Sequence, residues 1–195
     1  MRRIASDLGR HRRQWAFVGG FAVSARAEPR LTRDIDVAVT VEDDSDSEDL
    51  VRLLQADRYR PLASVEYEET GRLATVRLAS SVGDAGVVVD LLFASSGIEP
   101  EVVRAADLTE IVPGLSVPIA TTGHLIALKL LARDDQARPQ DLADLRALRA
   151  VATPADLSAA IEAVRLISAR GFDRGRDLTA ALKDFSGYPG ASADG

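Results

Sequence analysis

The chain has 195 residues, enough for one domain or for one domain with a small appendage, and long enough to bury a sizeable core. Its hydrophobic content of 46% and charged content of 28% are those of an ordinary folded protein. No apolar run approaches the roughly 20 residues of a membrane span, and the arginine-rich start lacks the apolar centre of a secretory signal. We therefore expect a cytoplasmic protein without a membrane partner.

The chain contains no cysteine and two histidines, His11 and His124. These counts exclude a disulfide framework and a thiolate metal site, and they argue against a histidine-based zinc site. Any bound metal should therefore be a hard cation held by oxygen ligands.

Charge is unevenly distributed along the chain. The net charge of −6 argues weakly against a general nucleic-acid coat, and residues 42–49 form an acidic run, EDDSDSED. Basic clusters are typical of solvated helix surface, and the alternative is a footprint for a phosphate-rich partner. The clustered arginines are Arg2, Arg3, Arg10, Arg12 and Arg13 near the start and Arg165, Arg170, Arg174 and Arg176 near the end.

The first half of the chain predicts alternating helices and strands. A Gly-Gly turn ends the first strand, Pro29 stops the second helix, and Leu50, Leu53 and Leu54 lie on the buried side of the third. Apolar residues alternate with polar ones in the second strand, and the last three strands predict a meander that extends the sheet. In order, the elements are a helix over 1–14, a strand over 15–20, a helix over 21–28, a strand over 33–41, a helix over 47–57 and strands over 61–69, 71–80 and 86–94.

From about residue 120 the pattern becomes helical. Helices are predicted over 121–133, 139–151, 153–168 and 174–185, the first and third with threonine caps. The fold class is therefore α/β, with a catalytic half over residues 1–118 and a helical half over 119–186. The tail, 187–195, is small and polar enough to be disordered.

Three aspartates predict a cation site. Side chains at i and i+2 share one face of a strand, so Asp34 and Asp36 point the same way and repel each other unless a cation lies between them. Asp90 interrupts an otherwise apolar strand, where a buried carboxylate requires a ligand or a partner. Three carboxylates from neighbouring strands would hold one or two magnesium ions, which suits phosphoryl or nucleotidyl transfer.

Gly19 and Gly20 join a strand to a helix. Such a turn presents backbone N–H groups and a positive helix end, which bind phosphate. Taken alone, the glycines are most simply interpreted as a plain tight turn. Taken alone, the acidic pair is most simply interpreted as surface carboxylates near a loop. Together, in this order, the two features are more specific.

The helical half supplies two further candidates. Lys129 has apolar neighbours on nearly every side, and its alternatives are a functional ammonium or snorkelling at the edge of the core. Asp141 and Asp144 lie one helical turn apart. Asp141 is explained as a cap or first-turn acid, so we assign function to Asp144. His124 is interpreted as a first-turn residue rather than a base.

These motifs resemble the nucleotidyltransferase superfamily, in which a Gly-Gly or Gly-Ser turn precedes an Asp-x-Asp pair and a third Asp follows on a later strand. More narrowly, Arg30-x-Thr32-x-Asp34-x-Asp36 and the later LIALKLLARDDQARPQDLADL resemble the AbiEii/MenT-type nucleotidyltransferase toxins of bacterial toxin–antitoxin systems. The resemblance covers residues 15–41, 86–93 and 121–148. It implies a nucleotidyltransferase-type mixed sheet with flanking helices.

The resemblance also implies a role for individual residues. It has Gly19 and Gly20 shaping the triphosphate turn, Asp34 and Asp36 binding magnesium, Asp90 completing the carboxylate set, Lys129 reaching the triphosphate and Asp144 lying near it in the cleft. Many superfamily members carry Ser where this chain has Gly20, so backbone contacts must suffice here. Thr32 is either a strand-entry residue or a hydroxyl aimed into the cleft. In the second case, modifying it would add negative charge beside the metal and switch the enzyme off.

We therefore expect Mg²⁺-dependent transfer of a nucleoside monophosphate from an NTP to a hydroxyl, with Mn²⁺ as a possible substitute and Asp90 assisting deprotonation. The resemblance implies the acceptor end of tRNA as substrate, a block of translation and growth, and a cognate antitoxin as partner. Two alternatives stay open. One is an enzyme of the same fold that modifies a protein, by AMPylation, or an antibiotic; the other is a catalytically inactive interaction module.

Overall fold

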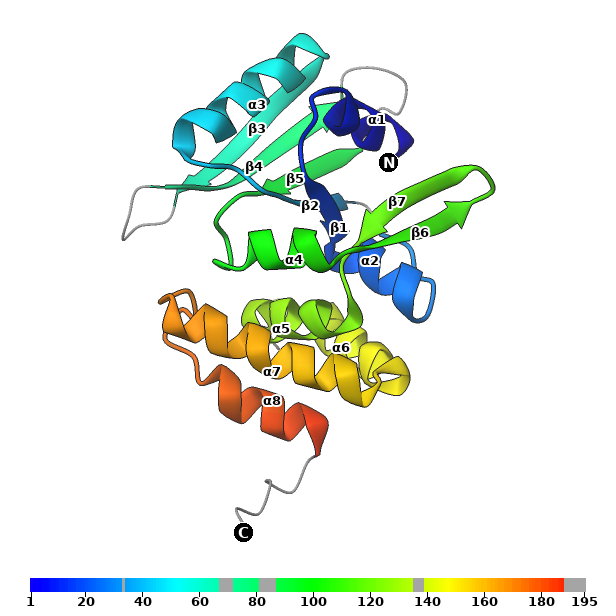
Figure 1. Ribbon diagram of the computed structural model, residues 1–195, viewed down its shortest axis with the longest axis vertical. Coiled ribbons are helices and arrows are strands. Elements are labelled where there is room, and N and C mark those ends of the chain that lie inside the picture. Colours follow the sequence, from blue (N-terminus) through cyan, green and yellow to red (C-terminus); the bar gives the residue numbers. More distant parts are fainter. Residues whose placement is uncertain (33, 67–71, 81–86, 135–138, 188–195) are drawn as a thin grey trace.

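A computed structural model describes residues 1–32, 34–66, 72–80, 87–134 and 139–187 of the chain (Figure 1). Within these ranges the protein has one mixed sheet of seven strands together with eight helices, which confirms the predicted α/β fold class. The tail predicted to be disordered lies outside the described residues from position 188 onward, as do 67–71 and 81–86 at the ends of the predicted strands.

The sheet has the strand order β3-β4-β5-β2-β1-β7-β6. β2 is parallel to β5 and β1 is parallel to β7, whereas the other neighbours are antiparallel. The predicted meander is β3-β4-β5, so that prediction is confirmed. The bounds are β1 (Trp15–Val18), β2 (Asp34–Val39), β3 (Tyr59–Glu66), β4 (Leu73–Ser80), β5 (Val88–Leu92), β6 (Asp107–Val112) and β7 (Leu115–Ile119).

The helices divide into two groups (Figure 1). α5 to α8 gather below the sheet, α4 lies between them and the sheet, and α2 contacts both α5 and α6. Each of these helices is too short or too polar to traverse a bilayer, as are the others in the described part of the chain. The bounds are α1 (Arg2–Arg10), α2 (Gly19–Arg26), α3 (Asp44–Ala56), α4 (Glu99–Ala105), α5 (Thr122–Ala132), α6 (Pro139–Val151), α7 (Pro154–Ala169) and α8 (Leu178–Ser186).

Threonine caps begin two of the helices that form the lower layer. The Thr121 side chain accepts a hydrogen bond from the backbone N–H of His124, which makes His124 a first-turn residue of α5 as predicted. Thr153 and Asp156 form a reciprocal capping box at the start of α7. The helix α5 is buried on most of its surface, and it packs against α7 and α6.

Several predictions about helices are wrong. The first helix ends at Arg10 rather than at residue 14, and the third begins at Asp44 rather than at residue 47. Leu53 was expected on the buried side of the third helix but is 40% exposed, because α3 buries the side that carries Leu50 and Leu54. The last helix begins at Leu178 rather than at Arg174. The preceding loop contains residues with positive φ, Arg174 among them, and this backbone conformation is incompatible with a right-handed helix.

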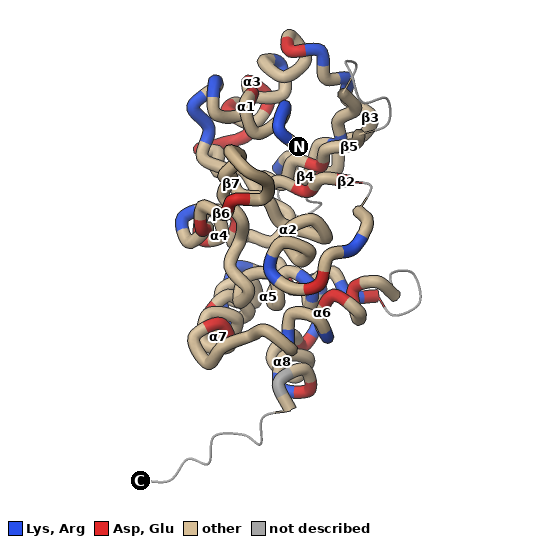
Figure 2. Tube along the Cα trace, turned by 90° about the vertical axis from the view of Figure 1, so that its right-hand side faces the viewer, with Lys and Arg blue, Asp and Glu red and all other residues tan. Residues whose placement is uncertain are grey.

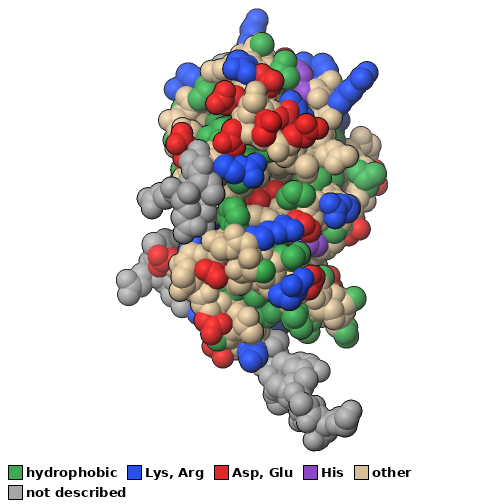
Figure 3. Space-filling view, turned by 60° about the vertical axis from the view of Figure 1, so that its left-hand side comes forward, with side chains coloured by type: hydrophobic (Ala, Val, Ile, Leu, Met, Phe, Trp, Pro, Cys, Tyr) green, Lys and Arg blue, Asp and Glu red, His purple; other side chains and the backbone are tan. Residues whose placement is uncertain are grey.

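Among the arginines near the start of the chain, Arg3, Arg10 and Arg13 pair with acidic residues. Arg10 donates a 2.9 Å hydrogen bond to Asp57, and Arg13 pairs with Asp46 of the acidic run. Figure 2 shows basic residues around α1 beside acidic residues of α3, and Figure 3 shows acidic side chains gathered with basic neighbours on the upper part of the molecule. These charges join α1 to α3, which favours a structural role for this basic cluster.

Candidate active site

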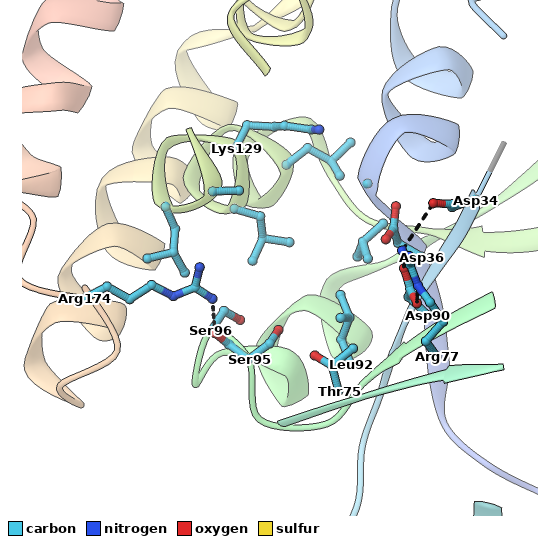
Figure 4. A pocket seen from close by; sticks show the side chains of 16 residues that line it. Asp34, Asp36, Thr75, Arg77, Asp90, Leu92, Ser95, Ser96, Lys129 and Arg174 are labelled. Atoms are coloured by element: carbon cyan, nitrogen blue, oxygen red, sulfur yellow. Dashed lines mark hydrogen bonds and ion pairs between the residues drawn. The ribbon is translucent and has the colours of Figure 1, made fainter. Parts of the chain in front are cut away.

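The three predicted aspartates come together on one face of the sheet. Asp36 on β2 lies directly opposite Asp90 on the parallel strand β5, and Asp34 shares the face of Asp36 two residues earlier. All three line a cleft of about 410 Å³ between the sheet and α5 (Figure 4). The strand pairing thus delivers the juxtaposition expected from the sequence.

Arg77 of β4 lies among these carboxylates. It pairs in register with Asp90, and its Nε and Nη2 donate hydrogen bonds of 2.8 and 2.7 Å to the two carboxylate oxygens of Asp90. Nη2 also lies 3.2 Å from Oδ2 of Asp34. The hydrogen bond to Asp90, followed by the charge of that carboxylate, raises the pKa of Arg77 above its ordinary value. We call Asp34, Asp36, Asp90 and Arg77 the sheet cluster.

The place of Arg77 in the cleft was not predicted from the sequence. The signal was present: Asp90 required a partner, and Arg77 is the single basic residue within the eight residues of the neighbouring strand. Its spacing from Asp90 in the sequence did not reveal the pairing, because that depends on the register of β4 against β5.

The carboxylate oxygens of the sheet cluster are the kind of ligand that a hard cation prefers. In the described part of the chain, no group of three His, Cys, Asp or Glu side chains is spaced to hold a metal ion. In this structure the guanidinium of Arg77 lies between Asp90 and Asp34, where it supplies the positive charge that these carboxylates require. A metal bound there would require Arg77 to withdraw.

Gly19 and Gly20 lie beside the carboxylates as the first two residues of α2, because β1 ends at Val18 rather than at residue 20 as predicted; we keep the name glycine turn for them. Gly19 has φ of +62°, and a β-carbon at this position would overlap the carboxylate of Asp36. A β-carbon at Gly20 would lie 2.6 Å from Nη2 of Arg30 and 3.0 Å from the methyl of Thr32. A serine at this position would therefore require the guanidinium of Arg30 to shift, and Thr32 lies against the turn.

The helical half contributes a buried charge network that we call the helix cluster. Nζ of Lys129 lies 2.7 Å from Asp141 Oδ1 and 2.8 Å from Asp144 Oδ2. Arg30, from the loop before β2, donates two hydrogen bonds of 2.7 Å to Asp144. The four residues connect the catalytic half to α5 and α6.

Burial and charge oppose each other at Asp144. Burial raises the pKa of this carboxyl, but hydrogen bonds from Arg30 and Lys129 together with their charges outweigh burial and lower the pKa. Asp141 occupies the first turn of α6 as predicted, yet its side chain is fully buried against Lys129, which was not predicted. Lys129 also lines the cleft. Its position is therefore compatible with both interpretations, a functional ammonium and a residue at the edge of the core.

The far side of the cleft is formed by Arg174 and the serines that follow β5. Figure 4 shows Arg174 across the cavity from Asp34, Asp36 and Asp90. Arg174 appears in the sequence merely as one member of a basic cluster, so its place in the cleft was not predicted.

Comparison with known proteins gives a family match over most of the chain. The profile of the family described as "Nucleotidyl transferase AbiEii toxin, Type IV TA system" matches residues 4–189. No curated protein sequence matches significantly.

Solved structures of similar fold include three nucleotidyltransferase-type proteins. An antigenic nucleotidyltransferase-like protein from Paracoccidioides brasiliensis is 18% identical with a TM-score of 0.54, covering 92% of this chain and 88% of its own. The antibiotic-resistance factor ANT(2'')-Ia is 19% identical with a TM-score of 0.49, covering 94% and 89%. The nucleotidyltransferase toxin MenT4 from Mycobacterium tuberculosis H37Rv is 14% identical with a TM-score of 0.40, covering 88% and 85%. The structural similarity to the first of these proteins, with a TM-score of 0.54, supports a shared fold and nothing further.

Proposed function

Because the chain belongs to the AbiEii family of nucleotidyl transferase toxins, we propose that it transfers a nucleoside monophosphate from an NTP to the 3′-terminal hydroxyl of tRNA. The observation that carries this proposal is the convergence of Asp34, Asp36 and Asp90 beside a glycine turn in one cleft. Carboxylates facing a phosphate-binding turn suit a reaction in which a magnesium–nucleotide complex is the substrate.

Asp34, Asp36 and Asp90 would hold Mg²⁺, or Mn²⁺ in its place. The ion, when bound, neutralises charge that develops on the α-phosphate and the departing pyrophosphate. Withdrawal of Arg77 frees the oxygens of Asp90 and Asp34 for this role. Backbone N–H groups of the glycine turn and the ammonium of Lys129 hold the β- and γ-phosphates, and the helical half, 119–186, completes the cleft.

The transfer step forms one bond and breaks another. The oxygen of the acceptor hydroxyl bonds to the α-phosphorus, the bond from that phosphorus to the bridging oxygen breaks, and pyrophosphate leaves with the electron pair. Asp90, released from Arg77, accepts the hydroxyl proton. The residues thereby orient both reactants in one cleft.

Family membership supports a toxin paired with a cognate antitoxin in the same cytoplasm. Modification of the tRNA acceptor end blocks aminoacylation chemistry at that hydroxyl and so halts translation and growth. Since the protein is acidic overall, it would reach RNA through local basic patches, and binding would weaken steeply with salt.

The test is to incubate the purified protein with Mg²⁺, each α-labelled NTP and total bacterial RNA, beside Asp36→Ala. We expect label in the tRNA band with the wild type and none with the variant. Label in a protein, or in an aminoglycoside or lincosamide added to the mixture, would overturn the tRNA assignment while leaving nucleotidyl transfer in place. No label in any acceptor, together with no Mg²⁺-dependent nucleotide binding by calorimetry, would favour an inactive interaction module.

A further inference from the structure

We propose that the end of the cleft opposite the carboxylates binds the nucleobase of the NTP, and that Arg174 selects bases with a carbonyl oxygen beside a second hydrogen-bond acceptor, which are guanine and cytosine. This inference rests on the proposed function in one respect, that an NTP occupies the cleft. Figure 4 shows the carboxylates on one side of the cavity, Arg174 on the other, and Leu92 between Asp90 and the serines. A nucleotide whose phosphates lie at the carboxylate end would extend its base toward Arg174.

The backbone holds Arg174 in an uncommon conformation. Its φ is +58°, in a loop where Gly171 and Gly175 also have positive φ. A non-glycine residue in this region is uncommon, and such strain clusters at binding sites. Nη2 of Arg174 donates a 3.0 Å hydrogen bond to the backbone carbonyl of Ser95, which fixes the guanidinium at the wall of the cleft.

The wall under Arg174 is itself built around a buried carboxylate. Glu99 is 2% exposed, and its Oε1 accepts hydrogen bonds of 2.8 to 2.9 Å from the backbone N–H and the hydroxyl of both Ser95 and Ser96. Each serine hydroxyl therefore donates its one proton in a hydrogen bond to Glu99. In the cleft these hydroxyls can therefore only accept.

Two contacts dock the loop that carries Arg174 onto this wall. Phe172 packs against Gly97, where a β-carbon would lie 2.5 Å from the ring. Arg170 forms a double ion pair with Glu101, at 2.8 and 3.0 Å. Both contacts precede Arg174 in the sequence, and they hold the segment that leads into Arg174 against this wall.

The middle of the cleft is apolar. Figure 4 shows Leu92 of β5 between Asp90 and the serines, and Leu128 and Leu131 from α5 also line the cleft. Planar bases and ribose rings pack on such surfaces, and a volume of about 410 Å³ falls in the range of small-ligand sites. The cleft therefore has a charged end for phosphates, an apolar centre, and a polar end for the edge of a base.

The chemistry of the polar end predicts which bases are preferred. A guanidinium has donors and no acceptor, so it pairs with two adjacent acceptors such as O6 and N7 of guanine or O2 and N3 of cytosine. The Ser95 hydroxyl, which can only accept, adds a partner for an amino group on the same base. Adenine has no carbonyl oxygen, so ATP should bind least well.

The test measures nucleotide binding without requiring an acceptor. Titration calorimetry with Mg²⁺ and NTP analogues that carry a methylene between the α- and β-phosphates gives affinities for all four bases. We expect the wild type to bind the cytosine and guanine analogues about 10-fold or more tightly than the adenine analogue. Arg174→Asn, in which asparagine tolerates positive φ, should bring the four affinities within about threefold of one another.

Two further variants keep the result interpretable. Arg174→Lys retains the charge but not the paired donors, so it should lose base selectivity while retaining overall affinity. Arg165→Gln removes the same charge from the exposed face of α7, where Arg165 pairs with Glu162, and should leave selectivity unchanged. Melting temperatures of all three variants would show that the fold is intact.

Several results would overturn the proposal. Equal weakening of all four analogues by Arg174→Asn would make Arg174 a phosphate ligand, and a wild-type preference for adenine would contradict the chemistry of the site. A wild type that binds no nucleotide would overturn both this proposal and the proposed function. Base-selective binding that depends on Arg174, without any labelling of RNA, would support this proposal and overturn the tRNA assignment alone.

Discussion

The sheet cluster and the helix cluster contain similar groups in different surroundings. In the sheet cluster the Arg77 side chain is 46% exposed, whereas in the helix cluster the Lys129 side chain is 8% exposed and Asp141 is fully buried. A half-exposed ion pair contributes little to stability, while a buried pair is costly to break. The ion pairs of the first cluster can therefore rearrange at low cost, whereas those of the second join the loop before β2 to α5 and α6.

The largest effect we expect comes from the sheet cluster and concerns activity. Asp36→Asn removes a charge that faces the cleft and should lower kcat by about 10³-fold, because transition-state charge loses its stabilisation. The melting temperature should stay near that of the wild type. Single-turnover labelling and thermal unfolding measure the two quantities, with Asp49→Asn, at an exposed pair on α3, as the control. Substantial residual activity would remove Asp36 from the site.

The helix cluster should show the opposite behaviour. Asp141→Ala leaves buried Lys129 without one of its two carboxylate partners and should lower the free energy of unfolding by about 3–5 kcal/mol. Urea unfolding followed by circular dichroism measures this loss.

Replacing the buried pair together sharpens the comparison. The double variant Lys129→Met with Asp141→Leu removes both charges, leaves Asp144 paired with Arg30, and should recover much of the stability. It should not recover transferase activity, because the ammonium at the cleft is gone. A single variant as stable as the wild type would contradict the structural role.

A smaller effect should follow from restoring serine at the glycine turn. Gly20→Ser places a β-carbon against the guanidinium of Arg30, whose hydrogen bonds to Asp144 must then lengthen or break. We expect a loss of about 1–3 kcal/mol in the free energy of unfolding. Gly9→Ser, where a β-carbon would meet open space, is the matched control in the same unfolding assay.

The smallest effect concerns pH. Burial lowers the pKa of His124, and the charge of Glu101 offsets this in part. As the pH falls below about 6.5, His124 of the unfolded chain takes up a proton more readily than His124 of the folded chain. The free energy of unfolding therefore decreases as the pH drops from 7 toward 5. His124→Gln should flatten this segment of the stability profile, measured by urea unfolding at several pH values. A profile unchanged by the substitution would exclude His124 as its source.

Local patterns predicted most of the fold. The threonine caps of α5 and α7 depend on neighbours in the sequence, and both appear in the structure. The second strand also forms, but its predicted alternation is wrong: β2 buries Val37, Ala38 and Val39 in succession, because it lies inside the sheet between β5 and β1. By contrast α4, β6 and β7 were not predicted. β6 exposes Leu108 at 77% and Val112 at 43%, so its apolar residues do not mark a buried face, and the hairpin is defined by its pairing along the edge of the sheet.

The same limit applies to the site. The three aspartates are recognisable because two share a strand and the third interrupts an apolar one. The pairing of Arg77 with Asp90 depends on strand register, and the pairing of Lys129 with Asp141 depends on helix packing. Both join residues 12 or more positions apart, and no local sequence pattern encodes such contacts. What each carboxylate faces therefore became clear only in three dimensions.

The far wall of the cleft also has a consequence for the order of events in synthesis. The segment 170–176, which carries Arg174 and docks on Gly97 and Glu101, follows every other part of the cleft in the chain. Because a nascent protein folds from its N-terminal end as it leaves the ribosome, the carboxylates and the glycine turn are in place well before this wall arrives. An enzyme proposed to stop translation would thus complete its own cleft only after residues 170–176 have left the ribosome.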